Sequence, residues 1–266
     1  MNDSADDLAD FDQTSVSYDG DTKQVFRAGS GPGVVVISEI PGITPEVAGF
    51  ARRVVDLGCT VAMPSLFGSP GRPESLPYVA RSMVGACVSR EFHCLARGEA
   101  SPVTVWLRHL ARDLHEECGG PGVGVIGMCL TGGFALAMMV DDTVVAPVLS
   151  QPSLPLPLGA KRKHDLGLSA ADLEIVKDRV GRGCSVLGLR FTRDAASPLE
   201  RFERLREELG EGFIGVEIDS GPGNPHGIDK RAHSVVTAHL VDEEGHPTRE
   251  ALDRVLDFFR DRLELA

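Results

Sequence analysis

Val123-Gly-Val-Ile-Gly-Met-Cys-Leu-Thr-Gly-Gly133 is the stretch that decides the fold, because an apolar run passes through Cys129 into a pair of glycines. Val123–Ile126 is typical of a buried strand, and the Ala- and Met-rich segment from Thr131 to Met139 is typical of a helix. Small residues around the cysteine allow strand and helix to approach closely and hold the central side chain in a strained, exposed turn. We interpret the stretch as a sharp strand-to-helix turn that presents a thiol.

Strand-like and helix-like segments alternate along most of the chain. Short β-branched runs are typical of strands covered on both faces, and longer amphipathic stretches of helices. We predict strands at 33–39, 59–63, 123–126, 144–149, 184–191 and 213–218, and helices at 46–57, 131–139, 198–209 and 247–265. Such alternation is typical of parallel strands joined by crossover helices. The sequence therefore predicts an α/β protein whose mainly parallel central sheet, with about six or more strands, is flanked by helices.

Length and composition favour one large domain. Domains of this class often reach about 250 residues, and the 266 residues with 42% hydrophobic content can bury a substantial core. We expect residues 21–266 to form a single domain and residues 1–20 to form an acidic tail or an edge hairpin. Residues 65–100, which contain several prolines and glycines, fit neither pattern. We expect them to form a loop or lid over the strand ends, with a plain surface excursion as the alternative.

The formal net charge of −12 disfavours nucleic acid and anionic membrane surfaces as partners. The first ten residues are acidic and lack the pattern of a signal peptide, and we find no apolar stretch that would span a bilayer. The six cysteines form no C-x-x-C pair and lack zinc-finger spacing. We therefore expect a cytoplasmic protein, monomeric or homodimeric, with reduced thiols.

Cys129 is the candidate nucleophile. A helix that begins directly after it points backbone N–H groups and a positive dipole end at the sulfur, which favours the thiolate. The alternatives for this turn are a buried, inert thiol or a phosphate-binding loop, although the spacing matches neither a Walker loop nor a complete G-x-G-x-x-G.

Four segments resemble the dienelactone hydrolase family of the α/β-hydrolase superfamily. Gly127-Met-Cys-Leu130 is similar to the G-x-C-x-G-G elbow of that family, and Ser38-Glu-Ile-Pro-Gly42 to its Glu-Ile-x-Gly segment. Pro64-Ser-Leu-Phe67 resembles its Pro-x-Leu-aromatic segment, and Asp194-Ala-Ala-Ser-Pro198 its D-x-x-V-P. The resemblance covers roughly residues 25 to 265. It implies an α/β-hydrolase fold and the hydrolysis of an ester or lactone.

The resemblance implies a role for each matched residue. Cys129 would attack the substrate carbonyl, and Asp194 would orient the catalytic base. Glu39 would hold or activate the resting thiol, while the backbone N–H groups of Ile40 and Leu130 would form the oxyanion hole. This chemistry needs no metal and no organic cofactor.

The base must be a histidine that follows Asp194, because the chain order in this superfamily is nucleophile, acid, base. His233 resembles the His-Ser-Phe of the family, and His226 resembles a His-Gly-Phe variant. We favour His233 as the base and keep His226 as the alternative. We expect His239 and His246 to be surface residues.

Three departures from the family pattern bear on the elbow and the substrate. Thr131 replaces a glycine, so the elbow must accommodate a β-branched residue or shift its helix start. Ser69 and Thr237 stand where the family has arginines that hold the substrate carboxylate, so dienelactone itself is not the expected substrate. The remaining candidates for binding an anion are Arg72, Arg81, Arg90, Lys230 and Arg231. Their alternative role is that of solvated surface charges.

These observations predict a hydrolase that cleaves a small-molecule ester or lactone through a Cys-His-Asp triad. One alternative is a thiol-based acyltransferase or peptidase on the same scaffold. The other is a non-catalytic ligand-binding protein, in which Cys129 would be buried and inert.

Overall fold

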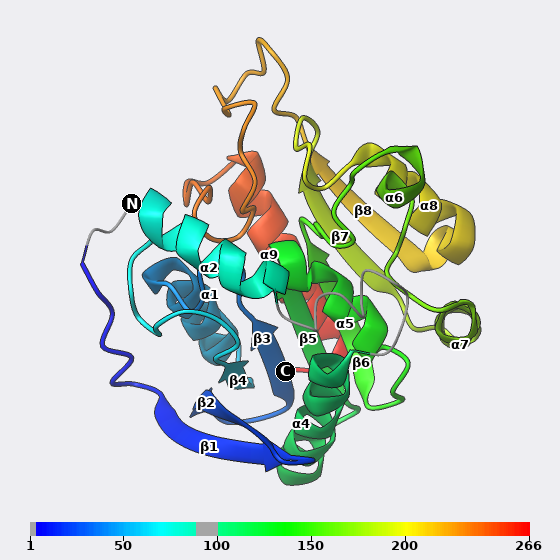
Figure 1. Ribbon diagram of the computed structural model, residues 1–266. Coiled ribbons are helices and arrows are strands. Elements are labelled where there is room, and N and C mark those ends of the chain that lie inside the picture. Colours follow the sequence, from blue (N-terminus) through cyan, green and yellow to red (C-terminus); the bar gives the residue numbers. More distant parts are fainter. Residues whose placement is uncertain (1–3, 89–100) are drawn as a thin grey trace.

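The computed structural model describes residues 4–88 and 101–266, which form an eight-stranded sheet with helices on both faces (Figure 1). The strands are β1 (Asp12–Tyr18), β2 (Asp21–Gly29), β3 (Gly33–Ile37), β4 (Thr60–Pro64), β5 (Val123–Met128), β6 (Val144–Ser150), β7 (Val186–Phe191) and β8 (Phe213–Ile218). The helices are α1 (Pro45–Asp56), α2 (Leu76–Val88), α4 (Pro102–Cys118), α5 (Gly132–Met138), α6 (Ala160–Lys163), α7 (Ala170–Gly181), α8 (Leu199–Leu209) and α9 (Pro247–Arg262).

The sheet has the strand order β1-β2-β4-β3-β5-β6-β7-β8. Every pairing from β4 to β8 is parallel, whereas β1 pairs antiparallel with β2 and β2 antiparallel with β4. The carboxyl ends of the parallel strands therefore lie at one edge, which is where open α/β sheets place their ligands. The predicted α/β-hydrolase fold with a mainly parallel sheet is confirmed.

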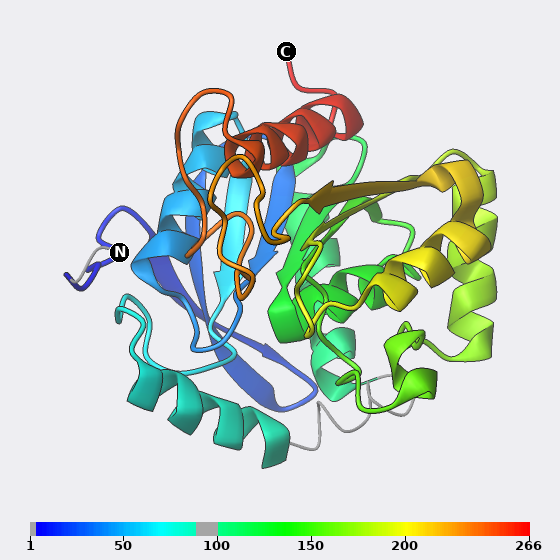
Figure 2. The same cartoon turned by 90° about the horizontal axis from the view of Figure 1, so that it is seen from above.

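Helices cover both faces of the sheet (Figure 2). Apolar side chains fill the two layers between the sheet and these helices. On one face, α1 and α9 contribute Phe50, Val54 and Phe259 to the core. On the other face, α4, α5 and α8 contribute Trp106, Phe134 and Phe202. The central strands β3, β4 and β5 are buried along their whole length, as expected for strands covered on both sides.

The N-terminal residues end in an edge hairpin. β1 and β2 pair along their whole length, from Asp12 opposite Arg27 to Tyr18 opposite Asp21. Before the hairpin, Leu8 and Phe11 are buried in the core beside α1. Antiparallel pairing at the edge therefore covers the side of β4 that faces away from β3.

The segment expected to form a lid contains a loop and helix α2. The Tyr78 hydroxyl accepts a hydrogen bond of 2.6 Å from the Ser69 backbone N–H, which ties α2 to the loop before it. Val79 and Met83 of α2 pack against the core. Residues 89–100, including Arg90, lie outside the described residues. Within the described ranges, no helix is both long and apolar enough to cross a membrane.

Candidate active site

Cys129 lies at a strained turn between β5 and α5. Its backbone φ angle is 54°, a left-handed conformation that residues other than glycine rarely adopt. The tightness of the turn explains the glycine before it, since a Cβ atom on Gly127 would lie 2.1 Å from the carbonyl oxygen of Thr131. Cys129 is 9% exposed and lines a cavity. The turn therefore presents the thiol at the carboxyl end of β5.

Thr131 fits the elbow because its hydroxyl hydrogen-bonds backbone groups of the two neighbouring strands, β3 and β5. Cys129–Thr131 forms one turn of 3-10 helix, and α5 begins only at Gly132. The Thr131 hydroxyl accepts a hydrogen bond of 2.8 Å from the Met128 N–H and lies 3.0 Å from the Ile37 carbonyl, to which it can donate. The β-branched residue is thus accommodated by a later helix start, and it ties the elbow to the end of β3.

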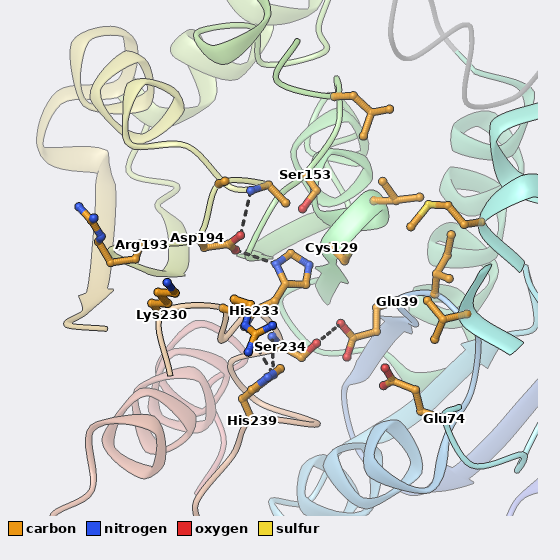
Figure 3. Close-up of a pocket in the computed structure, with 18 residues that line it drawn as sticks. Glu39, Glu74, Cys129, Ser153, Arg193, Asp194, Lys230, His233, Ser234 and His239 are labelled. Atoms are coloured by element: carbon orange, nitrogen blue, oxygen red, sulfur yellow. Dashed lines mark hydrogen bonds and ion pairs between the residues drawn. The ribbon is translucent and has the colours of Figure 1, made fainter. Parts of the chain in front are cut away.

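Asp194 and His233 are in direct contact. Asp194 lies three residues after the end of β7, and His233 lies in the loop between β8 and α9. The His233 Nδ1 atom is 2.7 Å from Asp194 Oδ2, while Asp194 Oδ1 accepts a hydrogen bond from the Ala196 N–H. The Cys129 side chain lies close enough to the His233 ring to raise the pKa of the histidine. The histidine therefore lies between the thiol and the buried carboxylate (Figure 3).

The electrostatic surroundings favour the imidazolium form of His233. Burial by itself lowers the pKa of His233, but attraction to Cys129 and the hydrogen bonds to Asp194 and Cys129 outweigh it. The net result is a pKa well above the ordinary value of 6.5. A cationic histidine is the partner that stabilises a neighbouring thiolate.

The other histidines are placed differently. His226 is exposed, and its ring lies 5.3 Å from that of His246, away from the residues that line the cavity. His239, expected at the surface, is exposed but also lines the cavity, and its Nδ1 atom accepts a hydrogen bond of 3.2 Å from the Ser234 N–H. Burial lowers the pKa of His239, which favours the neutral ring that this bond requires.

Glu39 lies in the same cavity as Cys129 and His233, where its carboxylate is held by three side chains. Oε2 accepts hydrogen bonds from Ser234 Oγ at 2.7 Å and Gln151 Nε2 at 3.1 Å, and Oε1 accepts one from the Thr237 hydroxyl. Glu39 is only 6% exposed. In the described residues it makes no hydrogen bond to Cys129. Figure 3 shows the carboxylate directed at Ser234. Its contacts therefore go to the loop that carries His233.

Gln151 is a polar residue of this network that the sequence analysis missed. It directly follows β6, and its Oε1 atom accepts a hydrogen bond of 3.3 Å from the Val235 N–H. Like Glu39 and Asp194, it lies just beyond a parallel strand, so its position relative to β6 was the available signal. Through Gln151, the carboxyl end of β6 is joined both to Glu39 and to the histidine loop.

The two backbone groups expected to form an oxyanion hole both belong to cavity-lining residues. The Leu130 N–H lies in the first turn of a helical segment, where such groups have no partner within the helix. The Ile40 N–H lies outside helices and strands and donates no hydrogen bond within the described residues. Both donors are therefore free to bind an oxygen atom of a ligand.

The cavity has a volume of about 480 Å³. One part of its wall is apolar and comes from Ile40, Val79, Met83, Leu130 and Leu156. Its cationic residues are Arg193, Lys230 and Arg231. Of the predicted anion-binding candidates, Lys230 and Arg231 thus line the cavity, and Arg193, which was not predicted, joins them.

Arg72 and Arg81, from the segment expected to form a lid, lie elsewhere, and Arg90 is outside the described residues. The Arg72 guanidinium stacks 4.3 Å from the centre of the Tyr78 ring, and Arg81 is an exposed residue of α2. Neither lines the cavity. Among the residues that the structure describes, no three His, Cys, Asp or Glu side chains are grouped so that they could hold a metal ion.

A buried arginine supports the wall beside Cys129. The Ser153 N–H donates a hydrogen bond of 2.9 Å to the Cys129 carbonyl. Arg201 of α8 is 2% exposed and donates to the carbonyls of Pro152, Pro155 and Asp165 at 2.6, 2.5 and 3.0 Å. Burial lowers the pKa of Arg201 to about 10. The segment that follows β6 is therefore held to α8 by backbone carbonyls.

Comparison with known proteins identifies the family. The model of the dienelactone hydrolase family matches residues 21–263. The chain therefore belongs to the dienelactone hydrolase family and is a hydrolase with the α/β-hydrolase fold, which confirms the resemblance seen in the sequence. A Saccharomyces cerevisiae protein named "Putative carboxymethylenebutenolidase" is 28% identical over 195 residues, which cover 70% of this chain and 67% of that protein.

Solved structures agree with this fold. A "putative dienelactone hydrolase" from Klebsiella pneumoniae has a TM-score of 0.64 at 19% identity, covering 94% of this chain and 97% of that one. A dienelactone hydrolase-like promiscuous phosphotriesterase from metagenomic libraries has a TM-score of 0.60 at 17% identity, covering 95% and 98%. At such identities the likeness concerns the fold alone.

Proposed function

We propose that the protein hydrolyses small carboxylic esters or lactones through a Cys129-His233-Asp194 triad. The observation that carries the proposal is the position of His233, which hydrogen-bonds Asp194 and lies close enough to Cys129 for the thiol to raise its pKa. Cys129 at a strained strand-to-helix turn supports it further, because such a turn exposes a nucleophile to substrate.

The reaction proceeds through a thioester on Cys129. The thiolate Sγ attacks the carbonyl carbon, and the developing oxyanion accepts hydrogen bonds from the Ile40 and Leu130 N–H groups. His233 donates a proton to the ester oxygen as the bond to the carbonyl carbon breaks, which releases the alcohol. His233 then takes a proton from water, whose oxygen attacks the thioester. The carboxylic acid leaves, and the thiolate and the imidazolium are restored.

Asp194 and Glu39 have separate tasks in this proposal. Asp194 accepts from His233 Nδ1, so the other ring nitrogen faces Cys129. Glu39 fixes the histidine loop through Ser234 and Thr237. Glu39 therefore acts on the thiol indirectly, by keeping His233 in place.

The test is the hydrolysis of short p-nitrophenyl esters and small lactones by the wild type, Cys129→Ala, His233→Ala and His226→Ala, with folding checked by circular dichroism. We expect kcat/KM to fall by about 10²–10⁴-fold in Cys129→Ala and in His233→Ala. His226→Ala is the matched control and keeps wild-type activity. A wild type that is inactive on every ester and lactone, or a fully active Cys129→Ala, would overturn the proposal. Transfer of the acyl group to added amines in place of water would indicate an acyltransferase.

A further inference from the structure

The cavity beside Cys129 is electrically asymmetric. Arg193, Lys230 and Arg231 line it from the two loops that follow β7 and β8. Figure 3 shows Arg193 and Lys230 on the Asp194 side of the site, with Glu39 and Glu74 on the opposite side. Three cations thus gather at one end of a cavity in a chain whose net charge is −12.

The cations at this end are available to a ligand. Neither Arg193 nor Lys230 takes part in an ion pair with any described residue, and both are exposed at the cavity. Arg231 has one partner, Asp229, at 3.5 Å and with both side chains largely exposed. Such exposed pairs are weak and exchange readily with another anion. This end of the cavity therefore attracts negative charge.

The opposite end suits an uncharged, apolar group. Val79 and Met83 line the cavity from α2, the helix on the Glu39 and Glu74 side (Figure 3). The acidic residue there is Glu74, and burial together with the negative charges of Glu39 and Glu46 raises its pKa. A further anion at this end would face both apolar side chains and two carboxyl groups.

The chemistry decides which part of an ester lies at each end. His233 must protonate the leaving oxygen, so the alcohol part of the substrate lies on the His233 side. Lys230 and Arg231 precede His233 by three and two residues, and Arg193 directly precedes Asp194. The cations therefore lie on the side of the alcohol part, and the apolar wall of α2 lies on the side of the acyl part.

We propose that the substrate is an open-chain ester of an uncharged, apolar acyl group with an alcohol that carries a carboxylate or phosphate. The proposal rests on the function proposed above and narrows it. An open chain can place its acyl group against Val79 and Met83 while its anion reaches Lys230 or Arg193. A small lactone cannot occupy both ends, because its ring ties the acyl and alcohol parts together.

Matched esters test this assignment. The anionic substrate is the hexanoate ester of 3-hydroxybenzoate, and its neutral match is the hexanoate ester of methyl 3-hydroxybenzoate. A third ester, methyl 3-hydroxybenzoate acylated with adipic acid, carries its charge on the acyl part. Each kcat/KM is divided by the rate of alkaline hydrolysis to correct for leaving-group reactivity. We expect the corrected kcat/KM of the anionic ester to exceed that of its neutral match by about tenfold. Each exposed charge pair contributes roughly two- to fivefold, and more than one cation lies at this end. The third ester should be the slowest.

Charge-removing variants show whether the preference comes from these residues. Arg193→Gln and Lys230→Gln should each lower the ratio of anionic to neutral ester by about two- to fivefold, and added salt should lower it in the wild type. Arg254→Gln is the control, because Arg254 is an exposed arginine of α9 with no ion pair among the described residues and lies outside the cavity lining. It removes the same charge and should leave the ratio unchanged.

The inference is overturned if the anionic ester is cleaved no faster than its neutral match. It is also overturned if Arg254→Gln lowers the ratio of anionic to neutral ester as much as the cavity variants do, or if a small lactone is cleaved as well as the anionic ester. These outcomes require an active wild type, so they leave the proposed ester hydrolysis standing. A wild type that cleaves none of these esters, and none of the p-nitrophenyl esters either, overturns both proposals.

Discussion

The Ser234 hydroxyl donates a hydrogen bond of 2.7 Å to the carboxylate of Glu39, so the residue after His233 is anchored to the segment that follows β3. Thr237 anchors the far end of the same short segment to the other oxygen of Glu39. The position of the proposed base therefore depends on a buried carboxylate that is not itself in the proposed triad.

This anchoring predicts that Glu39, Ser234 and Thr237 act as a unit. Glu39→Ala leaves three buried donors without an acceptor, so we expect the free energy of unfolding to fall by about 2–4 kcal/mol. We also expect kcat/KM to fall by about tenfold, with Ser234→Ala/Thr237→Val equally impaired and the triple variant no worse. Urea unfolding and ester kinetics measure both effects.

The matched control is Ser197→Ala, because the Ser197 hydroxyl is buried without a hydrogen-bond partner among the described residues. It should be neutral or slightly stabilising. If Ser234→Ala/Thr237→Val is fully active while Glu39→Ala is not, Glu39 acts on the thiol by another route.

The hydroxyl of Thr131 is predicted to be essential to the elbow. Thr131→Val keeps the shape of the side chain but leaves the Met128 N–H and the Ile37 carbonyl without their partner. We expect a loss of about 1–3 kcal/mol in unfolding free energy. Thr131→Ser keeps the hydroxyl and should lose less than half as much. Equal stability of Thr131→Val and the wild type in urea would refute this role.

The titration of His233 should depend on its two neighbours. Burial lowers its pKa, and Cys129 and Asp194 raise it. In Cys129→Ala we therefore expect the pKa of His233 to fall. NMR of the imidazole protons measures it. An unchanged pKa in this variant would mean that the thiol does not interact with the ring.

The same shift makes the stability contribution of His233 depend on pH. The pKa of His233 is higher in the folded state than the value of 6.5 expected in the unfolded state, so protonation of this residue favours folding. This stabilisation is complete below pH 6.5 and is lost as the pH rises through the folded-state pKa. Asp194→Asn weakens the imidazolium form, so it should destabilise the protein more at about pH 6 than above the measured pKa of His233. Equal destabilisation by Asp194→Asn at both pH values would contradict this direction of the pH dependence.

Arg201 is predicted to stabilise the wall beside Cys129. Arg201→Met fills much of the same space but leaves the carbonyls of Pro152 and Pro155 without donors. We expect a loss of about 2–4 kcal/mol in unfolding free energy and a rise in KM, because this wall carries Leu156. Arg204→Met, on the same helix but with an exposed side chain, is the control. Similar losses in both variants would argue against a special role for Arg201.

Much of the fold could be predicted because the parallel strands are continuous apolar runs. The predicted strand 213–218 matches β8, and the predicted start of the last helix matches α9. Helix α4 was not predicted, although Pro102 at its start and the apolar stripe through Trp106, Leu110 and Leu114 form a readable pattern. The sequence did not decide between a tail and an edge hairpin for residues 1–20, because alternating polar residues make an edge strand hard to distinguish from a loop.

The elbow, the candidate acid and both candidate bases could be named from the sequence, because local motifs carry them. The sequence left both His226 and His233 open as the base, since both lie in one irregular loop where spacing does not fix direction. The structure brings His233, and not His226, to Asp194. The partners of Glu39 were hidden for the same reason, because Gln151, Ser234 and Thr237 come from segments that meet only in the folded sheet. Arg193 was overlooked although it directly precedes Asp194.

The most direct test of the central claim is to identify the acyl-enzyme. His233→Gln removes the base that activates water, so an intermediate formed slowly from a p-nitrophenyl ester should persist long enough for mass spectrometry of proteolytic peptides. We predict one acyl group on the peptide that contains Cys129, released by hydroxylamine and absent when Cys129→Ala is added to the variant. An acyl group on another residue, or the same adduct without Cys129, would contradict the account.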